Sequence, residues 1–230
     1  MVDGPLIRDL KHEVITFDCY GTLVDWEGGI SAAIVAAASR AGIAIEPSTA
    51  LQLYMEIEPV VEAEAYRSYR DVLTETARRV AARLEWTISG PEAAFLPDSL
   101  PEWPVFEDTR AGLLQLVEAG HRLGILSNVD DDLLAATLRR LDVPFDPDLI
   151  VSAQAVGSYK PSHGHFLEAR RRIGGGRWLH AAQSWFHDVV PALELGIPVA
   201  WVNRNGEAPR DGLLPDLDVP SVAELAAALT

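Results

Sequence analysis

Short apolar runs recur along the chain, and segments of helical length separate them. Each run consists mostly of branched apolar residues and ends at polar residues or glycine, which is typical of buried strands. Strands are therefore predicted over residues 14–17, 122–126, 149–151, about 178–182 and 199–202. Stretches with helical periodicity, several of them closed by glycine, predict helices over 109–119, 131–141, from about 162, and over 189–195.

Strands that alternate with helices of this length form right-handed βαβ units with a mainly parallel sheet. The predicted fold class is therefore α/β, with a doubly wound, Rossmann-like core of five strands. Residues from about 30 to 84 differ, because they contain long helical segments and no strand pattern. We predict a core domain of residues 1–22 and 99–230. Residues 23–98 are predicted to form an inserted helical cap at the sheet edge where such folds bind ligands.

Composition and charge narrow the function classes. Hydrophobic residues make up 48% of the 230 residues and charged residues 23%, which indicates a globular protein. The formal net charge of −15 argues against a nucleic-acid partner, because phosphate-backbone binding needs clustered Lys and Arg. The same charge repels anionic substrates, so a site for a carboxylic acid must supply local positive charge or backbone amides.

The single cysteine, Cys19, excludes an internal disulfide and suits a reducing compartment. The first residues carry charges throughout, and no run approaches 18 apolar residues. We therefore expect neither secretion nor membrane insertion, and a cytoplasmic location. The Ala-rich helix at 31–39 could present an apolar face, which is compatible with a homodimer.

Polar residues at four places follow apolar runs: Asp18, Ser127 with Asn128, Lys160 and Asp188. The carboxyl ends of parallel strands share one sheet edge, so these residues are expected to meet in one crevice. A carboxylate beside a lysine and hydroxyl donors stays ionised and can act as a nucleophile. A second carboxylate can orient the lysine or a water.

Four segments resemble, in order and spacing, the motifs of the haloacid dehalogenase superfamily. They are residues 17–24 (FDCYGTLV), 125–128 (ILSN), 159–161 (YKP) and 187–188 (HD). The resemblance implies that Asp18 is the nucleophile, that Thr22 and Ser127 donate hydrogen bonds around it, and that Lys160 balances charge. Asp188 would help to position Lys160 or the hydrolytic water.

The branch of the superfamily follows from Tyr20. Phosphatase members carry an aspartate at this position as general acid, and they hold Mg²⁺ with further carboxylates, whereas this chain has Gln183 where one of these would lie. Tyr20 resembles the 2-haloacid dehalogenase branch, which displaces halide from a short (S)-2-haloalkanoic acid to give a 2-hydroxy acid. The resemblance therefore implies a hydrolase with no cofactor and no metal. Substrate-binding residues are predicted to be Tyr20, Asn128, Trp26, Phe166 and Trp185.

The chain also departs from that branch. Members of that branch have an arginine early in the cap that contacts substrate or halide, whereas this chain has Leu53 or Met55 near that position. Arg67 or Arg70 could replace it, although an arginine on a helix is more often a surface charge. Phe166 replaces a tyrosine, and Gln183 and Trp185 replace a serine and an asparagine. These departures leave open a ring-opening hydrolase similar to azetidine-2-carboxylate hydrolase, an atypical phosphatase, and a binding module without activity.

Three histidines, His163, His165 and His187, lack the spacing and the companion carboxylate of a metal site. They are predicted either to be exposed to solvent or to contact the site residues without contacting the substrate. Cys19 neighbours Asp18, but side chains alternate along an extended segment, so Cys19 is predicted to point into the core.

Overall fold

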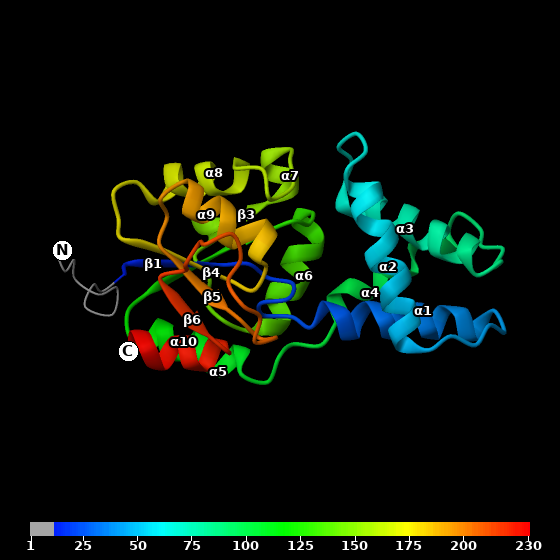
Figure 1. The fold of residues 1–230 in the computed structure, drawn as a ribbon, viewed down its shortest axis with the longest axis horizontal. Helices are drawn as coiled ribbons and strands as arrows, with labels where there is room; N and C mark the ends of the chain where they lie inside the picture. The colour runs from blue at the N-terminus through cyan, green and yellow to red at the C-terminus, as the bar shows by residue number, and fades with distance from the viewer. Residues whose placement is uncertain (1–11) are drawn as a thin grey trace. The chain divides into compact units, whose positions relative to one another are not determined.

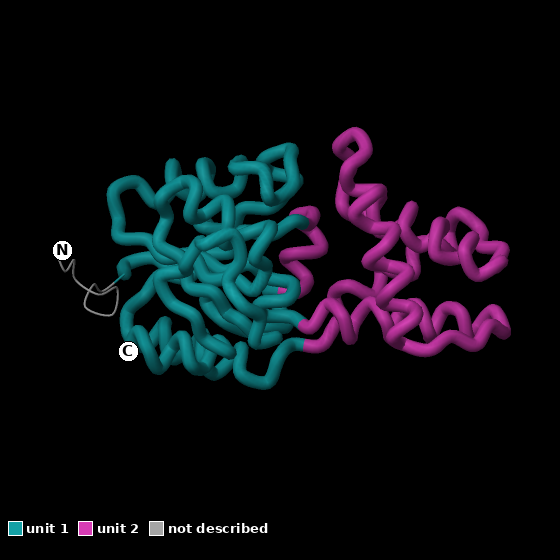
Figure 2. Tube along the Cα trace, viewed as in Figure 1, with its two compact units in different colours: residues 1–24, 105–128, 138–230 teal, residues 25–104, 129–137 magenta. Residues whose placement is uncertain are grey.

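The computed structural model describes residues 12–230 and divides the chain into two compact units (Figure 2). The sheet unit comprises residues 1–24, 105–128 and 138–230, and the helical unit comprises residues 25–104 and 129–137. The helical segment predicted over 23–98 falls almost entirely in the helical unit, which also takes in the start of the helix that follows Asn128. No helix among the described residues is long and apolar enough to span a membrane.

The sheet unit contains one parallel sheet of six strands, drawn in Figure 1. Its order is β3-β2-β1-β4-β5-β6, so the strand order reverses between β1 and β4, the switch point at which doubly wound sheets bind ligands. The α/β, doubly wound, parallel fold class is confirmed. The strands are β1 (Val14–Phe17), β2 (Arg122–Ser127), β3 (Ile150–Ser152), β4 (Trp178–Ala182), β5 (Val199–Val202) and β6 (Leu217–Val219).

The prediction of five strands was wrong by one, because β6 was missed. This edge strand has three residues, and the exposed Asp218 separates Leu217 from Val219. So short a run carries too little apolar pattern to be recognised. It pairs with β5 through the register Trp201↔Asp218.

Helices cover both faces of this sheet (Figure 1). Helices α5 (Thr109–Glu118) and α10 (Val222–Leu229) pack together on one face, and α8 (Gly164–Ile173) and α9 (Val190–Glu194) lie on the other. Strands β1, β4 and β5 are buried on both faces, which explains why their residues are mostly apolar; Thr16 in β1 and His180 in β4 are the exceptions. The largest side chains of the core cluster around them are Phe166, Trp178, Trp185 and Trp201.

The helical unit is built on α1 (Trp26–Arg40), α2 (Pro47–Glu62), α3 (Tyr69–Arg83) and α4 (Phe95–Ser99). Side chains cap two of these helices: Asp25 accepts from the amide of Gly28, and Ser68 accepts from the amide of Asp71. Asp130 lies just before α6 (Asp131–Leu141) and accepts from the amides of Tyr69 and Arg70, which ties its segment to the start of α3.

Candidate active site

Asp18 lies directly after β1, and a tight turn brings Thr22 back to it. Gly21 has a φ of 100°, a conformation that glycine adopts without strain, and the amides of Leu23 and Val24 donate to the carbonyl of Cys19. The Thr22 hydroxyl therefore reaches Oδ2 of Asp18 at 2.8 Å. The same hydroxyl accepts a hydrogen bond of 2.9 Å from the amide of Gln183, which fixes the direction in which it donates.

Lys160 joins the two carboxylates of the site. Its Nζ lies 2.9 Å from Oδ1 of Asp18, 2.6 Å from Oδ1 of Asp188 and 2.9 Å from the carbonyl of Leu126. These three acceptors use all three ammonium hydrogens, and the lysine is only 1% exposed. The structure thus brings Asp18, Lys160 and Asp188 together within the sheet unit.

Asn128 holds the backbone of Lys160 rather than its side chain. The Asn128 amide nitrogen donates to the Lys160 carbonyl at 3.0 Å, and its Oδ1 accepts from the Lys160 amide at 2.7 Å. The prediction that Asn128 binds substrate stays a prediction. What the structure adds is a role in fixing the loop that carries Lys160.

Lys160 and Asp188 were expected directly after strands, and this expectation was wrong in detail. Lys160 follows the short helix α7 (Ala153–Val156), which begins at the end of β3. Asp188 lies in η5 (Trp185–Val189), a π-helical turn that follows β4 and is capped by the hydroxyl of Ser184. Irregular backbone of this kind leaves little periodicity in a sequence.

A chain of buried hydrogen bonds continues behind Asp188. Oδ1 of Asp188 also lies 3.0 Å from Nε2 of His180, and Nδ1 of that ring lies 2.8 Å from Oγ1 of Thr16. Thr16 accepts in turn from the indole nitrogen of Trp178 at 2.8 Å. Oδ2 of Asp188 is buried and has no hydrogen-bond partner among the described residues.

Burial and charge act in opposite directions on these groups. Burial raises the pKa of Asp18, and Lys160 offsets this only in part. Burial acts in the same way on Asp188, but the charge of Lys160 and the hydrogen bond from His180 outweigh it and lower the pKa of Asp188 to about 2. The two carboxylates likewise outweigh burial at Lys160 and raise its pKa. Lys160 and Asp188 are therefore both charged at neutral pH.

The buried polar atoms of the sheet unit that have no partner among the described residues include Oγ of Ser127, the last residue of β2, and Nε1 of Trp185, the first residue of η5. The prediction that Ser127 donates a hydrogen bond around Asp18 was therefore wrong, and of the two hydroxyls only that of Thr22 does so.

Phe166 is fully buried and meets the ring of His180 edge-on, with centroids 5.2 Å apart. Tyr20 lies half-buried in the turn after Asp18. The substrate contacts predicted for Tyr20, Phe166 and Trp185 stay predictions.

Trp26 belongs to the helical unit, where it begins α1 and packs against Tyr54 at 6.0 Å between ring centroids. Its contact with substrate stays a prediction. The two arginines considered as replacements in the same unit pair with carboxylates there: Arg67 with Glu64, and Arg70 with Asp98 and Asp132.

The donor set does not fit a metal ion. Across residues 12–230 no three His, Cys, Asp or Glu side chains are grouped so that they could hold one. Nε2 of His165 donates to the carbonyl of Ser127 at 3.1 Å, and burial and the nearby Lys160 lower the pKa of His165 to about 3. Independence from metals and other cofactors stays a prediction.

Arg204 and the residues behind Asp188 were not predicted from the sequence. The Arg204 guanidinium donates to the carbonyl of Thr22 at 2.7 and 3.0 Å, pairs with Asp108 at 3.0 Å and stacks on Phe106. It thereby fixes the backbone of the residue that orients Asp18. For the residues behind Asp188, the sequence offered one indication, which is that Thr16 and His180 are polar residues inside apolar strands.

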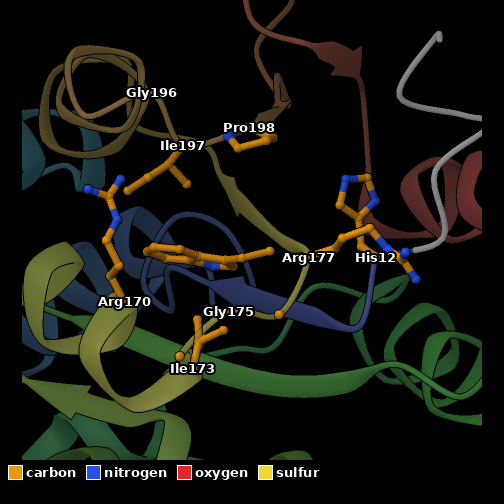
Figure 3. A pocket seen from close by; sticks show the side chains of 11 residues that line it. His12, Arg170, Ile173, Gly175, Arg177, Gly196, Ile197 and Pro198 are labelled. Carbon is orange, nitrogen blue, oxygen red and sulfur yellow. The ribbon is translucent and has the colours of Figure 1, made fainter.

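A separate cavity of about 340 Å³ lies near the opposite ends of the strands (Figure 3). His12, Arg170, Arg177 and Ile197 are among its lining residues, together with the glycine turn at 174–176. None of the predicted site residues lines this cavity. It is thus distinct from the site around Asp18.

Comparison with known proteins gives relatives of two activities. The chain is 27% identical over 219 residues to (S)-2-haloacid dehalogenase 4A of Burkholderia cepacia, and the match covers 91% of each protein. It is also 27% identical over 168 residues to the glyceraldehyde 3-phosphate phosphatase of Methanothermobacter thermautotrophicus, covering 66% of this chain and 74% of the phosphatase.

Known structures share the fold. A defluorinating L-2-haloacid dehalogenase matches with a TM-score of 0.80 at 22% identity, and the match covers 95% of both chains. The family model for haloacid dehalogenase-like hydrolases matches residues 12–223, a range that includes Asp18, Lys160 and Asp188. The chain therefore belongs to the haloacid dehalogenase-like hydrolases.

Proposed function

We propose that this hydrolase displaces halide from a short (S)-2-haloalkanoic acid through an ester on Asp18. The observation that carries the proposal is the buried arrangement of Asp18, Lys160 and Asp188 with Tyr20, rather than a second carboxylate, two residues after Asp18. A halide leaves without a proton, so this chemistry needs no general acid at position 20. Relatives named as (S)-2-haloacid dehalogenases support the substrate class.

In the first step a carboxylate oxygen of Asp18 attacks the α-carbon, the new C–O bond forms, and the carbon–halogen bond breaks to release halide. Lys160 and Thr22 hold the carboxylate in place through hydrogen bonds of 2.9 and 2.8 Å. The unpaired donors of Ser127 and Trp185 are candidates for the substrate carboxylate, which must find hydrogen bonds in a protein of net charge −15.

In the second step water attacks the carboxyl carbon of the Asp18 ester, and the ester C–O bond at that carbon breaks. Asp188 accepts the water proton and returns it to the departing alkoxide, which becomes the 2-hydroxy acid. The restored Asp18 carboxylic acid then loses its proton to solvent. Only the first step touches the α-carbon, so an (S)-substrate gives an (R)-hydroxy acid.

The test is halide release from chloroacetate, bromoacetate, fluoroacetate and both 2-chloropropionate enantiomers in chelator-treated buffer. Wild type should release halide, and of the two 2-chloropropionate enantiomers it should convert only the (S) form. Asp18→Ala should be inactive. Asp218→Ala, which removes an exposed carboxylate from β6, is the matched control and should retain activity.

Other outcomes would replace the proposal with one of two alternatives. Opening of azetidine-2-carboxylate without halide release would indicate an amine leaving group. Phosphate release from a phosphate ester that strictly requires Mg²⁺ would indicate a phosphatase, the activity of one relative at 27% identity.

A further inference from the structure

The two oxygens of the Asp188 carboxylate differ in their hydrogen bonds. Oδ1 receives hydrogen bonds from Lys160 at 2.6 Å and from His180 at 3.0 Å, while Oδ2 is buried and receives none from any described residue. A buried, ionised oxygen without a partner is costly unless it serves a ligand or a water. Oδ2 is therefore the oxygen that can accept a proton.

Two donors on one oxygen fix the carboxylate only if they are themselves fixed. Lys160 is fixed by its three acceptors, and its ammonium is shared with Asp18. His180 lies in β4, is fully buried, and meets Phe166 edge-on, so its ring cannot rotate freely. Its hydrogen bonds then decide which ring nitrogen carries the proton.

The direction of hydrogen bonding follows from the chain of partners. Oδ1 of Asp188 is ionised and can only accept, so Nε2 of His180 must carry a proton, and in the neutral ring Nδ1 is left as an acceptor. Thr16 accepts from the Trp178 indole through one lone pair, and its hydroxyl proton is available to Nδ1.

We propose that His180, Thr16 and Trp178 form a positioning chain that fixes Asp188 with Oδ2 directed to the water that hydrolyses the Asp18 ester. The proposal deepens the proposed function and rests on it. This positioning chain acts only on the second step, the hydrolysis of the ester. In that step water attacks the ester carbon, the water proton passes to Oδ2, and the ester C–O bond breaks. Halide displacement by Asp18 does not use Oδ2, so its rate should change far less than the rate of ester hydrolysis.

The test separates the two steps in single turnovers with (S)-2-chloropropionate, following the ester on Asp18 by mass spectrometry of quenched enzyme. In His180→Leu the ester should form within a few-fold of the wild-type rate but hydrolyse on the order of 10- to 100-fold more slowly, so that it accumulates. His180→Gln keeps a donor for Oδ1 and should restore most of the hydrolysis rate.

Thr16→Val tests the chain beyond His180, because it removes the hydroxyl whose proton is available to Nδ1. It should slow hydrolysis less than His180→Leu does, and the double variant should resemble His180→Leu alone. The matched control is His121→Leu, which removes another buried histidine hydrogen bond, 2.6 Å from the carbonyl of His12, at the other end of the strands. His121→Leu should not accumulate ester.

Equal slowing of both steps in His180→Leu, or ester accumulation in His121→Leu, would overturn the proposal and leave His180 a purely structural role. A second measurement does not depend on turnover or on the folding of a variant. Long-range ¹H–¹⁵N NMR of the wild-type protein should show His180 protonated on Nε2 and not on Nδ1. A proton on Nδ1 would overturn the proposal even if the protein hydrolyses no haloacid, which is how its failure differs from failure of the proposed function.

Discussion

Lys160 is the residue on which the charge balance of the site depends. Its ammonium separates two buried carboxylates that would otherwise repel each other, and no hydrogen of that ammonium is free. A lysine so fully paired is better suited to holding Asp18 in place than to binding substrate itself. The buried Ser127 hydroxyl, in contrast, has no hydrogen-bond partner among the described residues.

Lys160→Met should leave both carboxylates buried without a counter-charge. Removing one partner of a buried ion pair costs about 3–5 kcal/mol, so urea unfolding at pH 7 should show a loss of that size. Arg171→Met, which removes a largely exposed pair with Glu168, is the control and should cost less than about 1 kcal/mol.

The loss in Lys160→Met should depend on pH. Without the ammonium, burial raises the pKa of Asp18 and Asp188 in the folded state above the values in the unfolded chain. Groups with raised pKa values bind protons more readily when folded, so the variant should recover stability relative to wild type as the pH falls from 7 to 5. A difference that stays constant over this range would contradict the assigned charge balance.

The decline of activity at low pH should follow protonation of Asp18. Its pKa is raised above 3.8 by burial, which Lys160 offsets only in part, and attack requires the ionised form. The profile of kcat/KM against pH should therefore decline on the acid side with a midpoint above 3.8. A midpoint at or below 3.8, with the protein still folded by circular dichroism, would rule out Asp18 as the limiting group.

At the scale of elements, Arg204 connects the loop after β5 to the turn after β1. It binds the carbonyl of Thr22 and the carboxylate of Asp108, and Asp108 also accepts from the amide of Val222 at the start of α10. One guanidinium therefore holds three segments that are far apart in the sequence. A lysine could not reproduce this planar set of donors.

Arg204→Lys should destabilise the protein by about 1–3 kcal/mol and reduce turnover, because the turn that carries Thr22 loses its tether. Arg122→Lys is the matched control, since Arg122 is largely exposed and pairs with Asp146 in the same way. Unfolding and kcat measured on both variants check this. Equal effects in the two variants would show that Arg204 has no special role.

Comparison of the elements with the sequence shows where prediction succeeded. Strands β1 to β5 were predictable because each is a buried apolar run, and Asp18 was predictable because it ends one of them. The hydrogen bond between His180 and Thr16 was not predictable, because the two residues are 164 positions apart in the sequence. Arg204 lies 182 positions from Thr22. Such roles depend on packing that no local pattern records.

At the scale of the whole molecule, two of the four segments that join the two units leave the sheet unit side by side. Val24 and Val105 form an antiparallel bridge, and the amide of Phe106 donates to the carbonyl of Leu23. Both connections therefore start next to the turn that carries Thr22. The cap role of residues 23–98 at the active site stays a prediction.

The net charge of −15 should make kcat/KM depend on ionic strength. An anionic substrate is repelled at long range, and salt shortens that repulsion from about 30 Å at 0.01 M to about 8 Å at 0.15 M. Raising ionic strength over this range with a halide-free salt should increase kcat/KM about 2- to 5-fold. The neutral 2-chloropropionamide should bind as a competitive inhibitor with little salt dependence. A fall in kcat/KM would show that local positive charge dominates the approach.

In the proposed mechanism Asp18, and not water, attacks the substrate carbon. The most direct measurement is one turnover with enzyme in excess over (S)-2-chloropropionate in H₂¹⁸O, followed by mass analysis of the peptide that contains Asp18 and of the product. We predict that ¹⁸O enters the Asp18 carboxylate, because water attacks the ester at that carbon, and that the first 2-hydroxy acid formed is unlabelled. Direct appearance of ¹⁸O in the hydroxy acid, with Asp18 unlabelled, would contradict nucleophilic attack by Asp18.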